Sequence, residues 1–287
     1  MRTFGGDWTT EKLGRVKAYL DAYRVALSKQ PFFRLLYIDA FAGTGYRYSE
    51  EDGEDLALPE LAEEETQAYL AGSARLALEV DPPFSEYIFI EKSGVKIAEL
   101  RKLKAEFLGL SDRIKLIHRE ANSYIQELCD GDWSGKRAVM FLDPYGMQVN
   151  WDSIRAIAET KAIDLWYLFP LGVAVNRLLK RDGNISESIR SRLDELFGEQ
   201  TWFDAFYEAR STKTLFGEET RTDKVATFPA ISEYLVGRLK KEFAGVADNP
   251  RPLFNSRNNP LYLLCFAAAN PTGAKIAVRI AGCILKQ

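Results

Sequence analysis

The chain has few of the residues on which metal and thiol chemistry depend. Its 287 residues include one histidine, His118, and three cysteines, Cys129, Cys265 and Cys283. A single imidazole excludes a multi-histidine metal site, and the cysteines are too scattered for a disulfide framework or a zinc site of recognisable spacing. We therefore expect no metal ion and predict buried thiols. Any chemistry would use carboxylates, backbone groups or a cofactor.

Long apolar runs are also absent. No stretch approaches the roughly 20 apolar residues that cross a bilayer, and residues 1–20 lack the apolar centre of a signal peptide. We therefore predict a cytoplasmic protein with no membrane partner. With 46% hydrophobic residues the chain can bury a large core, and no linker divides it, so we predict a single domain over 1–287.

Charge is unevenly spread along the chain. The net charge is −3, but residues 48–74 hold nine of the 41 acids and no lysine or arginine. The remainder has 32 acids against all 38 bases, an excess of +6. We interpret residues 46–72 as an acidic insertion. The basic remainder fits either a polyanionic partner such as nucleic acid or an ordinary solvated surface.

Helical and strand-like segments alternate over the first 170 residues, which is typical of an α/β protein. Continuous apolar runs predict strands covered on both faces, and these lie at 33–41, 86–92, 114–120, 137–146 and 163–169. Apolar residues at helical spacing lie before and between them, at 9–29, 72–80, 95–108 and 122–130. We predict an α/β fold with a Rossmann-like, doubly wound, mostly parallel sheet.

The pattern changes after Pro170. Helical spacing predicts three further helices, at 184–198, 201–210 and 228–245. A last strand and a terminal helix follow, at 260–270 and 271–286. We interpret residues 172–248 as a helix-rich insertion or cap on the same sheet. Within it, Arg238, Lys240 and Lys241 are expected to form a solvated helix face.

Four consecutive predicted strands end in a carboxylate. Ligands of a doubly wound sheet bind beyond the carboxyl ends of its strands, so these ends supply the candidate site residues. They are Asp39, Phe41, Ala42, Gly43, Thr44 and Gly45, then Glu91 and Lys92, then Glu120, Ala121 and Asn122, then Asp143, Pro144, Tyr145 and Gly146. Each could instead shape a turn, form a surface ion pair or, for Glu120, cap a helix. Their coincidence on one edge favours a binding site.

The first of these ends, "YIDAFAGTG", differs from two common nucleotide motifs. No Gly-Lys-Ser or Gly-Lys-Thr follows its glycines, which excludes a P-loop. A dinucleotide site needs a third Gly or Ala where this chain has Tyr48, and an acid about 20 residues further on. Glu91 lies 52 positions after Asp39. The acidic insertion accounts for that distance but not for the missing glycine.

Two motifs resemble S-adenosylmethionine-dependent methyltransferases. "DAFAGTG" is similar to their first motif, in the form found in many amino-methyltransferases acting on nucleic acid, and "FLDPYG" resembles their Asp-Pro-Pro-Tyr motif without its second proline. From "EKLGRVKAYLDAY" to "PLYLLCFAAANPTG", nearly the whole chain resembles the three-Cys-motif partner protein (TcmP) family. That resemblance implies a class I methyltransferase fold and a three-Cys-motif protein as partner, but no settled substrate.

The resemblance also implies roles for the strand ends. Gly43 and Gly45 would admit the methionine end of S-adenosylmethionine, and Asp39 would orient that loop or accept a hydrogen bond from the ligand's ammonium. Glu91 would accept hydrogen bonds from the ribose hydroxyls. The adenine edge would meet Glu120, Ala121 and Asn122.

The fourth strand end would hold the methyl acceptor. Asp143 and the Pro144 carbonyl would accept hydrogen bonds from an incoming amine, and Tyr145 would stack on a flat substrate such as a nucleobase. These assignments predict an S-adenosylmethionine-dependent methyltransferase acting on an amine or base, with nucleic acid as a candidate substrate. The alternative is a methyltransferase-like, non-catalytic binding partner of a three-Cys-motif protein.

Overall fold

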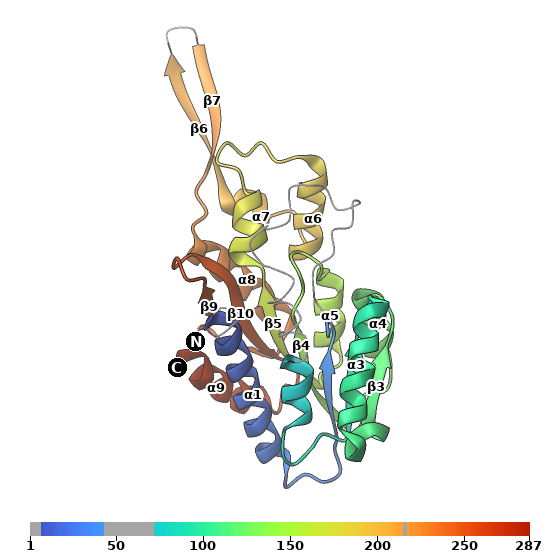
Figure 1. The fold of residues 1–287 in the computed structure, drawn as a ribbon. Helices are drawn as coiled ribbons and strands as arrows, with labels where there is room; N and C mark the ends of the chain where they lie inside the picture. The colour runs from blue at the N-terminus through green and yellow to red at the C-terminus, as the bar shows by residue number, and fades with distance from the viewer. Residues whose placement is uncertain (1–6, 43–71, 215–216) are drawn as a thin grey trace.

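The computed structural model describes residues 7–42, 72–214 and 217–287. The described residues form one eight-stranded sheet with helices on both faces and a separate two-stranded arm (Figure 1). The acidic insertion predicted at 46–72 lies outside the described residues except for its last position.

The sheet is mostly parallel. Its parallel strands are β1 (Arg34–Asp39), β2 (Glu86–Ile90), β3 (Ile114–Ile117), β4 (Lys136–Leu142) and β5 (Ile163–Phe169). The strand order is β3-β2-β1-β4-β5-β10-β8, with β10 (Pro260–Ala268) antiparallel to β5. The short strands β8 (Gly245–Val246) and β9 (Arg251–Phe254) both pair with β10. The predicted doubly wound, mostly parallel sheet is confirmed.

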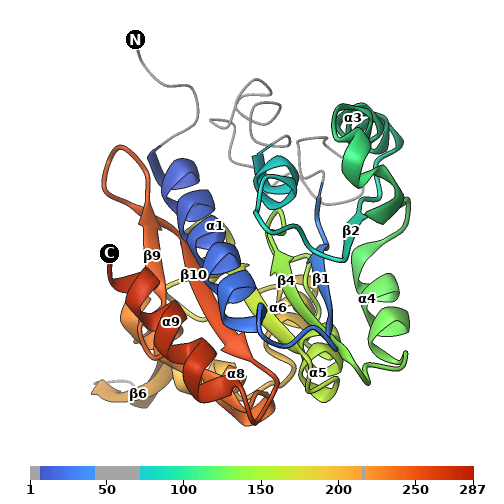
Figure 2. The same ribbon diagram turned by 90° about the horizontal axis from the view of Figure 1, so that it is seen from below.

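Helices cover both faces of the sheet. One face packs against α1 (Asp7–Leu27), the helical residues 72–78, α3 (Gly94–Glu106) and α9 (Ala274–Lys286), and a 3-10 helix, η2 (Leu108–Arg113), follows α3. The other packs against α4 (Ala121–Cys129), α5 (Trp151–Glu159) and α8 (Phe228–Glu242). Figure 2 shows α1 and α9 side by side on the first face. Because both faces are covered, the strands are apolar without alternation.

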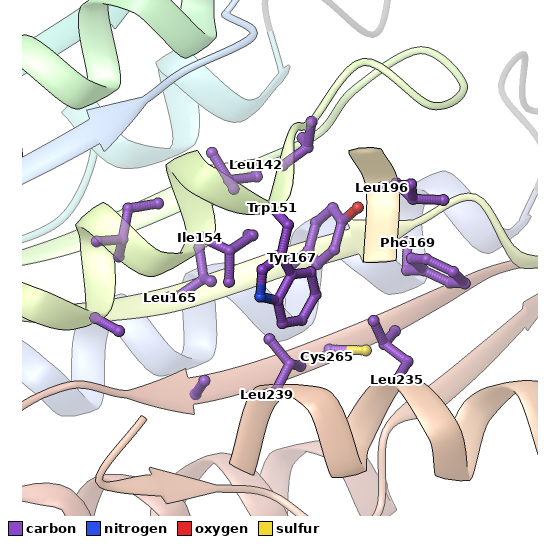
Figure 3. Close-up of a cluster of buried hydrophobic side chains, with 14 of the residues drawn as sticks. Leu142, Trp151, Ile154, Leu165, Tyr167, Phe169, Leu196, Leu235, Leu239 and Cys265 are labelled. Atoms are coloured by element: carbon purple, nitrogen blue, oxygen red, sulfur yellow. The ribbon is translucent and has the colours of Figure 1, made fainter. Parts of the chain in front are cut away.

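The core on the α5 side is centred on Trp151 and Tyr167 (Figure 3). The guanidinium of Arg238 lies 4.8 Å from the Trp151 ring centroid, donates to the Phe197 carbonyl at 2.9 Å and pairs with Glu199 at 2.9 Å. The prediction that Arg238 is solvated is therefore wrong. The charge of Arg238 can be buried because residues 197–199 supply a carbonyl and a carboxylate as hydrogen-bond acceptors.

The segment after β5 is helix-rich, as predicted, but it also contains an arm. It comprises the π-helical η3 (Leu171–Asn176), α6 (Glu187–Phe197), α7 (Trp202–Phe206), the arm and α8. The helix predicted at 201–210 ends at Phe206, where β6 (Tyr207–Thr214) begins and pairs with β7 (Gly217–Lys224). This hairpin projects from the body (Figure 1). Its threonines and alternating charges lack the apolar stripe that a packed helix needs.

Close packing fixes η3 against the sheet. A Cβ on Gly172 would lie 1.8 Å from the carbonyl oxygen of Pro260, so only glycine fits where η3 crosses the start of β10. Of the predicted buried thiols, Cys129 and Cys265 are buried and Cys283 is exposed. Within the described ranges, no helix is both long and apolar enough to cross a membrane.

Candidate functional site

Three carboxylates gather at the carboxyl edge of the sheet. Asp39 ends β1, and its register partners are Phe89 on β2 and Phe141 on β4. Glu91 and Asp143 come two residues after those partners, so the period-2 alternation of strands places all three acids on the α1 face. All three are buried. The strand order therefore brings together side chains that are 52 and 104 positions apart.

Asp143 is bound by a lysine from the first helix. The Lys12 ammonium donates to Asp143 Oδ2 at 2.6 Å, and the lysine side chain is fully buried. It lies 5.3 Å from the ring centroid of Trp8 and 5.7 Å from that of Phe141. Burial raises the pKa of Asp143 well above its ordinary value and lowers the pKa of Lys12, while the charge of Asp39 raises the latter. Lys12 thus orients the carboxylate in an apolar setting.

Asp39 is wholly buried. Burial raises its pKa to about 6, although the Ser73 hydroxyl, the Phe41 amide and the Lys12 ammonium lower it. Among the described groups, none makes a hydrogen bond of ordinary geometry to either of its carboxylate oxygens. A buried acceptor without such bonds is costly unless a ligand satisfies it. Asp39 is therefore suited to a cationic hydrogen-bond donor.

Glu91 begins the turn between β2 and α3. Its Oε1 accepts a hydrogen bond from the backbone amide of Ser93 at 2.6 Å, which holds the side chain at the sheet edge. The pKa of the half-buried Lys96 is lowered by burial and raised by the charge of Glu91. Lys92 is exposed, and its carbonyl lies 3.0 Å from His118 Nε2.

Glu120 caps the helix that follows β3. Its carboxylate accepts from the backbone amides of Asn122 at 2.9 Å and Ser123 at 2.8 Å, at the N-terminus of α4. Although burial acts to raise the pKa of Glu120, these hydrogen bonds lower it. Glu120 therefore has the capping role that the sequence left open.

Asn122 joins the ends of β3 and β4. Its amide nitrogen donates to Glu120 and to the Gln148 carbonyl at 2.8 Å, and its oxygen accepts from the Asn150 amide and the Ser153 hydroxyl, both at 3.0 Å. Both hydrogens and both lone pairs of the amide are thus used. The sequence predicted that Glu120, Ala121 and Asn122 meet the adenine edge. Because Glu120 and Asn122 are hydrogen bonded within the protein, their contribution there would be to shape the surface beside the adenine.

The loop after β4 presents the remaining candidates. Pro144 is buried and Tyr145 half-buried, and the Tyr145 amide donates to Gln148 Oε1 at 3.0 Å. Gly146 has a positive φ of 66°, which suits the tight turn at this point. The Asn122 contacts anchor the far end of the same loop. Pro144 and Tyr145 therefore start a loop fixed at both ends.

The predicted residues lie in different parts of the sheet edge. Asp39, Glu91 and Asp143 come together on one face, whereas Glu120 and Asn122 lie at the adjacent strand end and hydrogen bond within the protein. The chain continues beside the end of β2 after β1 ends. The Ala42 amide donates to the Ile90 carbonyl at 3.0 Å, and half-buried Phe41 packs on the core. Gly43, Thr44 and Gly45 lie outside the described residues.

Sequence reasoning missed Lys12. It lies four residues before Val16 and in line with Tyr19 and Tyr23, all buried on the inner face of α1. A lysine on an otherwise apolar helical stripe is the signal that could have indicated a buried ion pair.

The acids at this edge suit a cationic ligand. Asp39, Glu91 and Asp143 supply three carboxyl groups, and Lys12 and Lys96 supply the nearby ammonium groups. S-adenosylmethionine carries a sulfonium and an ammonium, and a buried carboxylate without hydrogen bonds of ordinary geometry suits the latter. The residues present therefore fit this cofactor.

Comparisons with known proteins find similarity only in structure. No family model and no curated protein matches the chain. Spermidine synthase from Thermotoga maritima is 12% identical, with 94% of this chain and 62% of that chain covered and a TM-score of 0.42. The glycopeptide N-methyltransferase MtfA, solved with S-adenosyl-L-homocysteine, is 12% identical over 87% and 89%, with a TM-score of 0.34. A putative rRNA-methylase from Clostridium thermocellum is 13% identical over 72% and 96%, with a TM-score of 0.26.

These likenesses are too distant to transfer a substrate or a residue's role. The topology of the chain itself defines its fold. The order β3-β2-β1-β4-β5-β10-β8, with β10 antiparallel beside β5, is that of a Rossmann-like, doubly wound and mostly parallel α/β fold. The predicted fold class is confirmed, with a largely helical insertion after β5.

Proposed function

We propose that the protein is an S-adenosylmethionine-dependent methyltransferase acting on an amine or base, with nucleic acid as the favoured substrate. The observation that carries this proposal is the position of Asp143 and Pro144, which follow β4 beside Asp39 and Glu91. In a doubly wound sheet this is the edge at which ligands bind. The resemblance of the sequence to three-Cys-motif partner proteins supports a three-Cys-motif protein as a partner.

When bound, S-adenosylmethionine would supply an activated methyl group. Asp39 would accept hydrogen bonds from the ammonium of its methionine part. The role predicted for Gly43 and Gly45 beside that part stays a prediction, because both lie outside the described residues. Glu91 would accept from the ribose hydroxyls, with its carboxylate held by the Ser93 amide. Lys92 would flank the nucleoside, and the α4 N-terminus, shaped by Glu120, would bound the adenine.

Asp143 and the Pro144 carbonyl would receive the methyl acceptor. Both are hydrogen-bond acceptors, so they would hold an amine by its hydrogens with the nitrogen lone pair turned toward the methyl group. Positioning of this kind can lower a barrier by up to about 7–11 kcal/mol. Lys12 orients the carboxylate, and Tyr145 would stack on a nucleobase for about 1–3 kcal/mol.

Calorimetric titration with S-adenosylmethionine tests the cofactor. We expect Glu91→Gln to weaken binding, whereas the matched variant Glu86→Gln should bind like the wild type. Glu86 is a buried acid at the start of β2, the strand that Glu91 follows, so it lies at the opposite edge of the sheet, paired with Arg34 and Lys115. Absence of any binding heat, with an unchanged melting temperature, would contradict the proposal.

Methyl transfer is tested with labelled cofactor and total RNA, DNA and protein. Asp143→Ala should leave cofactor binding largely intact and abolish labelling, and labelling of protein alone would exclude nucleic acid. A non-catalytic binding role is the second candidate, because Asp143 already holds an ammonium of the chain itself. Cofactor binding without labelling of any fraction would favour that role.

A further inference from the structure

A cluster of basic side chains lies where the β6–β7 arm leaves the body. Three hydrogen bonds join the base of this hairpin to the end of η3 and the chain that follows it. Lys224 Nζ donates to Asn176 Oδ1 at 2.7 Å, the Lys224 amide donates to the Arg181 carbonyl at 2.8 Å, and the Tyr207 hydroxyl donates to the Lys180 carbonyl at 2.9 Å. We define the root of the arm as residues 177–183 with Lys224. These hydrogen bonds hold the root in a fixed conformation against the hairpin.

Most charged side chains at this root are cationic. Lys180 and Arg181 are exposed, and Lys224 is half-buried beside them. Lys224 and Arg181 are neighbours, because the Lys224 amide donates to the Arg181 carbonyl at 2.8 Å. Burial lowers the pKa of Lys224, and the charge of Arg181 lowers it further. The acid between them and the arm, Asp182, accepts a hydrogen bond from the Asn184 amide at 3.0 Å.

The arm itself is differently arranged. Arg210 and Arg221 face each other across the hairpin. Each has an acid on its own strand within ion-pair distance, Glu208 at 3.7 Å and Asp223 at 2.9 Å. These two arginines of the arm are therefore each compensated by an acid of the same strand, whereas Lys180, Arg181 and Lys224 lie together at the root. Neighbouring like charges repel, and a polyanion relieves that repulsion.

The root is also connected to the candidate site. η3 begins directly after β5, at the same carboxyl edge where Asp39 and Asp143 lie, and Gly172 fixes it against β10. The root therefore directly follows, along the chain, the helix that begins at the edge where the methyl acceptor is proposed to bind.

We propose that the root of the β6–β7 arm binds the phosphate backbone of a single-stranded nucleic-acid substrate. This inference rests on the proposed function, because it assigns that enzyme its substrate class. Lys180 and Arg181 contact phosphates, which position the strand without reading its sequence. Lys224 holds the root in shape through Asn176.

Binding of labelled single-stranded RNA and DNA oligonucleotides, followed by fluorescence anisotropy at several salt concentrations, tests the inference. Each phosphate contact contributes about 0.7 to the slope of log affinity against log salt for a single strand. The double variant Lys180→Gln with Arg181→Gln should therefore lower the slope by about 1.4 and weaken binding roughly 20-fold near 0.1 M salt. Calorimetry with S-adenosylmethionine should give the wild-type affinity for this variant.

The matched control is Lys240→Gln with Lys241→Gln, which removes the same charge from the exposed last turn of α8. Its affinity and salt slope should equal those of the wild type. An equal loss in the control would show that net charge alone drives binding, and would overturn the inference. So would an unchanged slope in the root variant, tighter binding of polyglutamate than of either oligonucleotide, or no oligonucleotide binding by a wild type that still binds S-adenosylmethionine.

Discussion

Removing the Lys12 ammonium should destabilise the fold strongly. Lys12 and Asp143 form a buried pair at 2.6 Å, with side-chain exposures of 0% and 8%. Lys12→Met keeps the length and apolar stem of the side chain but leaves the carboxylate buried without its cation. Breaking a buried pair in this way costs about 3–5 kcal/mol. We expect a loss of that size in the free energy of unfolding at neutral pH.

The loss should depend on pH and on the partner. Without Lys12 the pKa of Asp143 rises further, so folding takes up a proton and stability falls as pH rises. Lys12→Met should therefore lose less at pH 5 than at pH 8. The double variant Lys12→Met with Asp143→Asn buries no charge and should recover most of the loss.

Urea unfolding followed by circular dichroism measures these values, with Lys17→Met as the control. Lys17 lies on the same helix but is one-third exposed and pairs with Asp21 at 2.9 Å, so its replacement should cost about 0.5 kcal/mol or less. A loss below about 1 kcal/mol for Lys12→Met at neutral pH would refute the reasoning, because it would mean that the pair is neutral in the folded protein.

Two further predictions concern packing and pH. Gly172→Ala should destabilise by about 1–3 kcal/mol or more, because its Cβ would overlap the Pro260 carbonyl. Gly237→Ala, in open space within α8, should stabilise by roughly 0.5–1 kcal/mol. Thermal melting checks both, and equal effects would contradict the packing argument. Burial raises the pKa of Asp164 to about 7, so the folded state binds the extra proton and stability should fall by up to about 4 kcal/mol between about pH 4 and 7. Guanidinium unfolding should show that Asp164→Asn makes this decline smaller than in the wild type, while Asp39, with a pKa of about 6, still makes stability fall as the pH rises from about 4 to 6. A wild-type stability that increases with pH over this range would contradict the sign.

The parallel sheet could be predicted from the sequence because its strands are buried on both faces. Such strands are short, continuous apolar runs, and 163–169 matches β5 at both ends. The β6–β7 arm could not be predicted in this way. Its strands pack against each other and project from the body, so they carry no core-facing pattern. The helix predicted at 201–210 is present as Trp202–Phe206, with Trp202 and Phe206 buried, and only its end was misjudged.

In the candidate site, too, contacts between residues close in sequence could be predicted, whereas contacts between residues far apart in sequence could not. The acids at the strand ends could be identified from the sequence, because a polar residue directly after an apolar strand indicates the sheet edge. Capping by Glu120 was also a local possibility, since its partners are two and three residues away. The partner of Asp143 is 131 residues away, on a helix whose sequence pattern indicates only burial.

That distance matters for the chemistry. An exposed Asp143 would be an ordinary carboxylate, whereas this one is buried and pairs with the Lys12 ammonium, which lies near the Trp8 and Phe141 rings. A substrate amine that approaches Asp143 therefore meets a carboxylate whose geometry and protonation are set by α1. If the proposed transfer takes place, a conservative Lys12→Arg variant should change the pH profile of transfer more than the affinity for S-adenosylmethionine, because Lys12 contacts the acceptor side of the site. An equal loss of cofactor affinity would instead assign Lys12 to the Asp39 side, where its charge also acts.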